Sequence, residues 1–275
     1  MKQYYFISGL PRSGSTLISV ILRQNPDFYA DIPSQIEAFT GKSIDIITGS
    51  ESNFTVTEEQ RKNLLYGIFD GYYQHIEKPV IFDNSRSWTK KTSLLRALFP
   101  YTKILCPVRD IVSILNSFET ISSKNPFYTN TLSEHNKNVF ERCDGIMDRN
   151  KGIVAKPWIS LQEGYALNPE MIHFIEYEDL CREPEKTMRG VYEFLEKPYY
   201  SHDFENVEYS NENFDRACNL KDLHTVKRRV EYKPPRCILP PEIVKKYSEM
   251  NNETPYSQEW WHKYSKINNF EVNYV

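Results

Sequence analysis

The sequence predicts an α/β fold in which a parallel β-sheet is flanked by helices, within one domain over residues 1–275. Short apolar runs alternate with longer stretches whose apolar residues recur every three or four positions. A glycine-containing turn joins the first apolar run to the first such stretch. Alternating strands and helices form parallel sheets through right-handed crossovers, and ligands then bind at the carboxyl ends of the strands.

The first half of the chain is expected to supply three strands and four helices. Apolar residues predict strands at 4–8, 80–82 and 103–108. Helical apolar spacing predicts helices at 16–24, 58–76, 92–99 and 111–121. Residues 27–57 have a loop-rich composition, with short helical pieces around 34–47.

The second half is expected to add one strand and four helices. Periodicity predicts helices at 133–148, 157–167, 184–195 and 240–250, and a strand at 171–177. Residues 124–131 form a polar loop, residues 198–238 are polar and irregular, and Trp260 and Trp261 lie in a final aromatic segment. No repeat, low-complexity stretch or linker divides the chain.

Composition excludes several classes of protein. A net charge of −3 argues against a general nucleic-acid binder, whose surface would be basic. The five cysteines are scattered with no C-x-x-C pair, which favours free thiols in a reducing compartment over disulfides or a zinc site. The N-terminus has no signal-peptide pattern, and no apolar run approaches the roughly 18 residues of a membrane span. We therefore expect a cytoplasmic protein without a membrane span.

Residues 9–16, Gly-Leu-Pro-Arg-Ser-Gly-Ser-Thr, carry the strongest functional signal, and we call them the phosphate loop. A glycine turn between strand and helix gathers N–H groups around an anion at the positive end of the helix. Ser15 stands where nucleotide kinases have a lysine, and the basic residue is Arg12 instead. The pattern favours a bound phosphorylated nucleotide; the alternative is an ordinary Gly/Ser turn that caps a helix.

A second pattern follows the strand at 103–108. Arg109 stands at its end, and Ser113 and Ser117 lie on the polar face of the next helix. Because strand ends meet at one edge of a parallel sheet, we expect residues 83–86, Arg109 and Glu178 to cluster beside the phosphate loop. A surface salt bridge with exposed serines is the alternative explanation of this pattern.

These motifs resemble those of the sulfotransferases that use PAPS, 3′-phosphoadenosine 5′-phosphosulfate. Their P-[KR]-S-G-[ST]-T motif is matched fully by Pro11, Arg12, Ser13, Gly14, Ser15 and Thr16. Their strand-end arginine, followed eight residues later by a serine, is matched by Arg109 and Ser117, and their Tyr-Glu-Asp-Leu segment by residues 177–180. Bacterial-type members are similar also in segments 82–88, 117–119, 223–230 and 238–241, so the resemblance covers most of residues 3–245. Protein-tyrosine and cytosolic sulfotransferases are more distantly similar.

The resemblance implies the sulfotransferase fold and the transfer of a sulfonate from PAPS to a hydroxyl acceptor (EC 2.8.2), with PAP as product. It also implies a set of cofactor-binding residues: Pro11, Arg12, Ser13, Gly14, Ser15, Thr16, Leu17, Arg109, Ser117, Tyr177, Lys227, Arg228 and Arg229. Arg109 and Ser117 would hold the 3′-phosphate, and Tyr177 would lie near the adenine. The basic run at 227–229 would cover the 3′-phosphate, unless it is a solvated charged face.

The catalytic groups that we predict are Arg12, Arg86 and Glu37. A transferring sulfonate carries less charge than a phosphoryl group, so arginines and backbone N–H groups can stabilise it without a metal ion. Arg86 is the second charge-stabilising group or else a surface arginine. The position at which protein-tyrosine sulfotransferases carry a glutamate base holds Pro33, so that match fails. Glu37 is the nearest candidate base, whereas Asp31 is a loop or cap residue.

The acceptor is not defined by the sequence. Inserts at about 28–57 and 122–170 are expected to shape its pocket, and a loop at about 198–238 to cover the cofactor. Aromatic residues in these inserts favour a phenolic small molecule, while a glycan or a peptidyl tyrosine stays open, as does the oligomeric state. Two other functions are weighed: a phosphate-loop kinase, which would need ATP, Mg²⁺ and the missing lysine, and a nucleotide-binding protein without activity.

Overall fold

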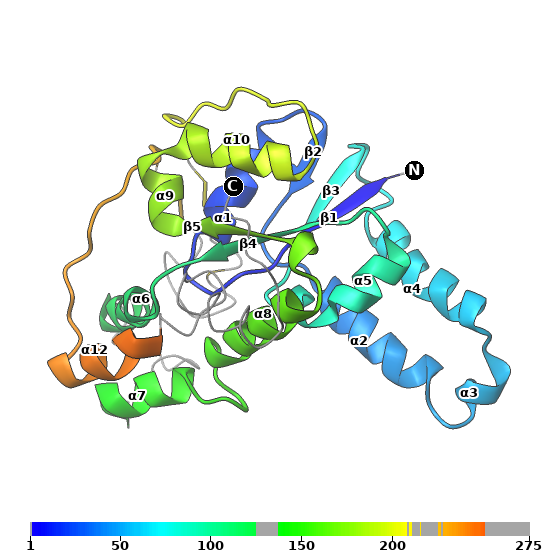
Figure 1. Cartoon of the computed structure of the whole chain (residues 1–275), viewed down its shortest axis with the longest axis horizontal. Coiled ribbons are helices and arrows are strands. Elements are labelled where there is room, and N and C mark those ends of the chain that lie inside the picture. The colour runs from blue at the N-terminus through cyan, green and yellow to red at the C-terminus, as the bar shows by residue number, and fades with distance from the viewer. Residues whose placement is uncertain are drawn as a thin grey trace, which may run out of the picture.

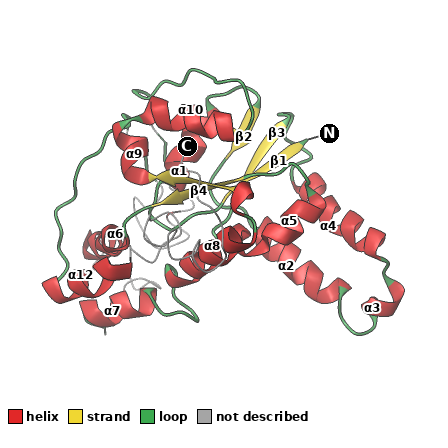
Figure 2. Ribbon diagram, viewed as in Figure 1, coloured by secondary structure: helices red, strands yellow, loops and turns green. Residues whose placement is uncertain are grey.

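The computed structural model describes residues 2–124, 137–207, 209–210, 215, 225–226 and 228–250. Its centre is a five-stranded sheet in which every neighbouring pair is parallel (Figures 1 and 2). The strand order is β2-β3-β1-β4-β5, with β1 Gln3–Ile7, β2 Phe28–Ala30, β3 Val80–Asn84, β4 Ile104–Val108 and β5 Ile172–Glu176. The predicted α/β class with a parallel sheet is confirmed.

Helices connect the strands and cover both faces of the sheet (Figure 2). Their bounds are α1 Ser15–Arg23, α2 Ile36–Ile47, α3 Ser52–Thr55, α4 Glu58–Tyr72, α5 Thr92–Leu98, α6 Ile111–Lys124, α7 Val139–Ile146, α8 Ala155–Leu167, α9 Tyr177–Arg182, α10 Pro184–Phe194 and α12 Pro241–Ser248. Two 3₁₀ turns, η1 Trp88–Lys91 and η2 Pro169–Met171, precede α5 and β5. Capping boxes fix two helix starts, at Thr57 with Gln60 and at Asn138 with Glu141.

Four sequence expectations differ from the structure. The helix predicted at 133–148 is α7, which begins at Val139 after the N-cap Asn138 and ends at Ile146. The segment at 27–57 contains the strand β2 and a continuous helix α2, where a loop with short helical pieces was expected. Helix α4 ends at Tyr72 rather than at residue 76, because Tyr73 leaves the helical conformation and its hydroxyl bonds to Asp83. The strand predicted at 171–177 stops at Glu176, and Tyr177 begins helix α9. Residues 133–136 of the predicted helix at 133–148, and Trp260 and Trp261, lie outside the described residues.

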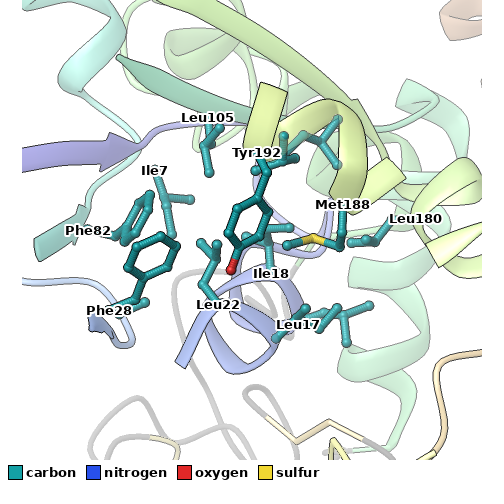
Figure 3. Close-up of a cluster of buried hydrophobic side chains, with 14 of the residues drawn as sticks. Ile7, Leu17, Ile18, Leu22, Phe28, Phe82, Leu105, Leu180, Met188 and Tyr192 are labelled. Atoms are coloured by element: carbon teal, nitrogen blue, oxygen red, sulfur yellow. The ribbon is translucent and has the colours of Figure 1, made fainter. Parts of the chain in front are cut away.

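The side chains of β1 alternate between two cores, one on each face of the sheet. Tyr5 and Ile7 pack with α1, α9 and α10, and Figure 3 shows this core, in which Tyr192 of α10 stacks on Phe28 of β2. Tyr4 and Phe6 pack on the opposite face with α2, α4, α5 and α8. Both faces of the sheet are covered, which explains why the central strands β1 and β4 are almost entirely apolar.

The connections place a topological switch point between β1 and β4. From β1 the chain passes through α1 to β2 at one edge, and from β4 it passes through α6, α7 and α8 to β5 at the other edge. The segments that follow β1 and β4 therefore diverge at the carboxyl ends of two adjacent strands. Such a divergence opens the crevice in which doubly wound sheets bind ligands.

Candidate active site

The first part of the phosphate loop runs along the end of β4. Ser8 N donates to Leu105 O at 2.9 Å and Leu10 N donates to Pro107 O at 2.9 Å. A Cβ atom on Gly9 would lie 2.0 Å from Pro107 O. Only glycine fits at this position, so the sequence itself fixes how closely the loop approaches β4.

The second part of the loop turns back through left-handed backbone conformations into α1. Arg12 has φ 60° and Gly14, the N-cap of α1, has φ 88°. A Cβ atom on Gly14 would lie 2.9 Å from the ring carbon Cδ2 of Tyr177. The first turn of α1, which starts with Ser15 and Thr16, carries no acidic residue, so its N–H groups and positive dipole end face the loop without a carboxylate of their own turn.

Two arginines link the phosphate loop to the segments beyond β4 and β5. Arg12 Nε donates to Ser117 Oγ of α6 at 3.2 Å. Arg109 Nη1 donates to Arg12 O at 3.3 Å, and Arg109 Nε donates to Glu178 Oε1 at 3.3 Å. The guanidinium carbon of Arg109 lies 4.2 Å from the centroid of the Tyr177 ring. Arg109, Glu178 and the loop therefore meet at the switch point, as the sequence predicted.

Two neighbouring positive charges act on Arg12 in this corner. Burial lowers the pKa of Arg12 to about 10, and the charges of Arg109 and Arg86 act in the same direction. Tyr177 and Asp215 act in the opposite direction. We call Arg12, Arg86 and Arg109 the arginine cluster. Arg109 and Arg86 each repel the charge of Arg12, so an anion placed beside Arg12 is stabilised.

Glu37 lies on the β3 side of the site, in the first turn of α2. Its carboxylate Oε1 is 2.8 Å from Lys91 Nζ and 3.4 Å from Lys90 Nζ, and its side chain is 15% exposed. The predicted base is thus held in two ion pairs. Asp31, the other acidic residue considered, pairs with Arg23 at 3.3 Å and accepts from the Ile32 backbone N–H at 2.8 Å, as a loop residue does.

The sequence placed Asp83 in the expected cluster at the strand ends but assigned it no role. Its side chain is fully buried near the end of β3 and accepts hydrogen bonds from Ser34 Oγ at 2.5 Å, Tyr73 OH at 2.5 Å and Trp88 Nε1 at 2.6 Å. A signal for it exists in the chain, because Asp83 is the one acidic residue in the apolar run of β3. A buried carboxylate needs such donors, and these donors come from three separate segments of the chain.

The basic run has polar partners within its own loop. Arg228 Nε donates to Asn206 Oδ1 at 2.9 Å, and Arg229 Nε is 3.0 Å from Glu205 Oε2 with both side chains exposed. Lys227 lies outside the described residues. Contact of this run with a cofactor stays a prediction.

Comparisons with known proteins give one consistent result. A family model described as “Sulfotransferase family” matches residues 5–201. Protein-tyrosine sulfotransferase A of Caenorhabditis elegans is 26% identical over 240 residues, which are 80% of this chain and 60% of that protein. The chain thus spans 60% of the length of this curated relative.

Solved structures with the same fold are also sulfotransferases. A sulfotransferase domain from the curacin biosynthetic pathway has a TM-score of 0.52 at 17% identity, with 99% of each chain covered. Mouse sulfotransferase SULT7A1, solved in complex with PAP, has a TM-score of 0.51 at 12% identity, with 97% of this chain and 89% of that chain covered. At these identities the likeness supports the fold. In the described part of the chain, none of the helices has the length and apolar character that crossing a bilayer requires.

Proposed function

The chain belongs to the sulfotransferase family, and we propose that it transfers a sulfonate group from PAPS to a hydroxyl acceptor. The observation that carries the proposal is the phosphate loop itself, which bends around Arg12 while Arg109 and Arg86 lie in electrostatic reach of it. The loop lacks the lysine of ATP-dependent enzymes and supplies guanidinium groups instead. A kinase function has no comparable support.

The residues at the switch point fit the two anionic ends of PAPS. We assign the amides of residues 13–17 and the hydroxyls of Ser15 and Thr16 to the 5′-phosphosulfate. Arg109 and Ser117 are assigned to the 3′-phosphate, and Tyr177, beside Gly14 and Arg109, to the adenosine. Since Arg12 already bonds to Ser117, the two anion sites are close neighbours. The basic run at 227–229 is proposed to cover the 3′-phosphate.

In the proposed reaction the acceptor oxygen forms a bond to sulfur while the bond from sulfur to the 5′-phosphate oxygen breaks. These three atoms must lie in line, so positioning supplies much of the rate. Arg12 and Arg86 neutralise the charge that develops on the sulfonate and on the leaving phosphate oxygen, a role that needs no metal ion. The acceptor proton passes to Glu37. Both lysines contact Oε1 of Glu37, so Oε2 is the oxygen that we assign to the proton.

A phenolic hydroxyl is the acceptor class that we propose first. The curated relative is by name a protein-tyrosine sulfotransferase, and the tyrosine side chain is a phenol. The aromatic side chains of the inserts fall into two groups. Phe28 and Trp158 are buried in the core, whereas Phe39 and Phe54 are exposed and are available to an acceptor. Glycans are a second acceptor class to be assayed. Separately, the scattered cysteines lead us to propose a cytoplasmic location.

Ligand-dependent melting tests the nucleotide assignment. A ligand that binds only the folded state raises Tm once its concentration exceeds Kd. We expect PAP to raise Tm and ATP with Mg²⁺ to leave it unchanged. The reverse pattern would contradict the proposal. Release of PAP from PAPS is then measured with three acceptor sets, namely simple phenols, tyrosine peptides and sugars, and turnover with none of them would leave only nucleotide binding.

A further inference from the structure

We propose that Asp83 is a positioning residue, which holds the turn that carries Glu37 and the turn that carries Arg86 in the arrangement that transfer requires. This inference rests on the proposed function and goes beyond it. It concerns the acceptor side of the site, at the end of β3. Asp83 is assigned no contact with the acceptor or the nucleotide.

The first argument is the chemistry of the buried carboxylate. Asp83 is 0% exposed, and burial of a carboxylate is unfavourable unless donors surround it. Three donors do so, at 2.5, 2.5 and 2.6 Å. Burial raises the pKa of Asp83, and the three hydrogen bonds act in the opposite direction. Short bonds to a charged acceptor are stronger and more directional than neutral ones, so this carboxylate fixes its partners firmly.

The second argument is where the donors come from. Ser34 stands two residues before α2, and its backbone N–H donates to Asn84 O at 2.9 Å. Its Oγ also accepts from the Ile36 backbone N–H at 3.2 Å, so it fixes the start of the helix whose first turn carries Glu37. Trp88 begins η1, directly after the turn that carries Arg86. One carboxylate therefore holds both segments.

The third argument is that the two segments also hold each other. Lys91, in the same 3₁₀ turn as Trp88, pairs with Glu37 at 2.8 Å and donates to its backbone carbonyl at 3.3 Å. Its Nζ lies 6.0 Å from the centroid of the Trp88 ring. A closed path thus runs from Asp83 through Ser34 to Glu37, and back through Lys91 and Trp88. Loosening one bond of the path changes the orientation of Glu37 without touching it.

The third donor supplies a control within the same cluster. Tyr73 lies at the C-terminal end of α4, which carries none of the residues assigned to catalysis or binding. Its hydroxyl bonds to the same carboxylate at the same 2.5 Å as Ser34 Oγ. Ser34→Ala and Tyr73→Phe therefore each remove one hydrogen bond from Asp83, and Ser34→Ala also removes the acceptor of the Ile36 N–H. A purely structural role of the cluster predicts similar effects of the two substitutions on activity, whereas a positioning role predicts different ones.

The experiment compares these two variants with wild type and with Ser34→Thr, which retains the hydroxyl. Turnover is measured as PAP release with the best acceptor from the screen, at a temperature well below the Tm of each variant. The rate is divided by the concentration of PAP-binding sites, which calorimetric titration gives, so that only folded protein is counted. We expect Ser34→Ala to lower kcat about 10-fold or more, since small misplacements of reacting groups have large effects on rate. Tyr73→Phe and Ser34→Thr should stay within about 2-fold of wild type, and the Kd of PAP within about 2-fold in all variants.

Hydrogen exchange measures the arrangement without an acceptor. With PAP bound, Ser34→Ala should speed amide exchange in residues 34–38 and 85–91, and Tyr73→Phe should not. Equal kcat losses in both variants, or an unchanged kcat in Ser34→Ala, overturn the inference. If wild type turns over no screened acceptor, the proposed function fails while exchange still decides the positioning role: faster exchange confined to Ser34→Ala supports it, and any other pattern overturns it.

Discussion

Replacing Arg109 by methionine tests the assignment of the 3′-phosphate. The Arg109 side chain is 10% exposed and is oriented by its bonds to Glu178 Oε1 and Arg12 O, so its charge is little screened and its position is fixed before any ligand arrives. A hydrogen bond to a charged group contributes about 1.5–3 kcal/mol. The Kd of PAP should therefore rise about 10- to 150-fold.

The substitution also leaves Glu178 without its 3.3 Å partner, and this could distort the loop. Two ligands separate the effects. Calorimetric titration of 5′-AMP, which lacks the 3′-phosphate, should give nearly the same Kd in wild type and variant. Arg182→Met is the matched control, because Arg182 stacks on Tyr232 at 4.4 Å much as Arg109 stacks on Tyr177 at 4.2 Å, and it should change neither Kd. Equal losses for PAP and AMP would show that Arg109 acts through the loop, and an unchanged Kd of PAP would refute the assignment.

Three other predictions concern stability and rate. Gly9→Ala would place a Cβ atom 2.0 Å from Pro107 O and should destabilise the fold by about 3 kcal/mol or more. Gly67→Ala is the control, because its Cβ atom would have no atom within 4 Å, and it should stabilise the fold slightly. Similar denaturation midpoints for the two variants would contradict the packing argument. Arg12→Lys keeps the charge but loses the planar fork, so kcat should fall about 100-fold or more, and an effect on KM alone would restrict Arg12 to binding. Burial lowers the pKa of His202 from 6.5 to about 4, so the unfolded chain binds the proton more readily than the folded protein. The free energy of unfolding should therefore be at its full value above about pH 6.5 and should decline by up to about 3 kcal/mol as the pH falls to about 4. Denaturant titrations of wild type and His202→Asn across this range check it, and identical pH profiles would exclude His202 as the cause.

The geometry of the phosphate loop and its neighbours could be predicted because its determinants lie close together in the sequence. The residues of the phosphate loop are consecutive, and their geometry follows from local rules: glycine at the close approach to Pro107 and a helix that starts directly after Gly14. Arg109 follows its strand directly, and Glu178 lies two residues past the end of its own. Parallel strands bring those ends together, so chain position alone predicts the meeting of these groups.

The β3 side could not be predicted in the same way. The donors to Asp83 lie 49, 10 and 5 positions away in the chain, and no local pattern pairs them. Glu37 was predicted as a base from its position, but its ion pairs with Lys90 and Lys91 depend on how α2 packs beside η1. The strand β2 escaped prediction because it has three residues, too few to show alternation. Helix α9 was not predicted because no side-chain cap marks its start.

The left-handed backbone at Arg12 has a consequence for how such a protein evolves. At φ 60° a side chain is sterically unfavourable by about 1–2 kcal/mol, and glycine would relieve this crowding. Glycine would also remove the guanidinium that we propose neutralises the transferred sulfonate. Stability therefore favours glycine at position 12, whereas the proposed activity favours arginine. On the proposed function, a relative of this chain that carries glycine at this position would have gained stability and lost sulfonate transfer.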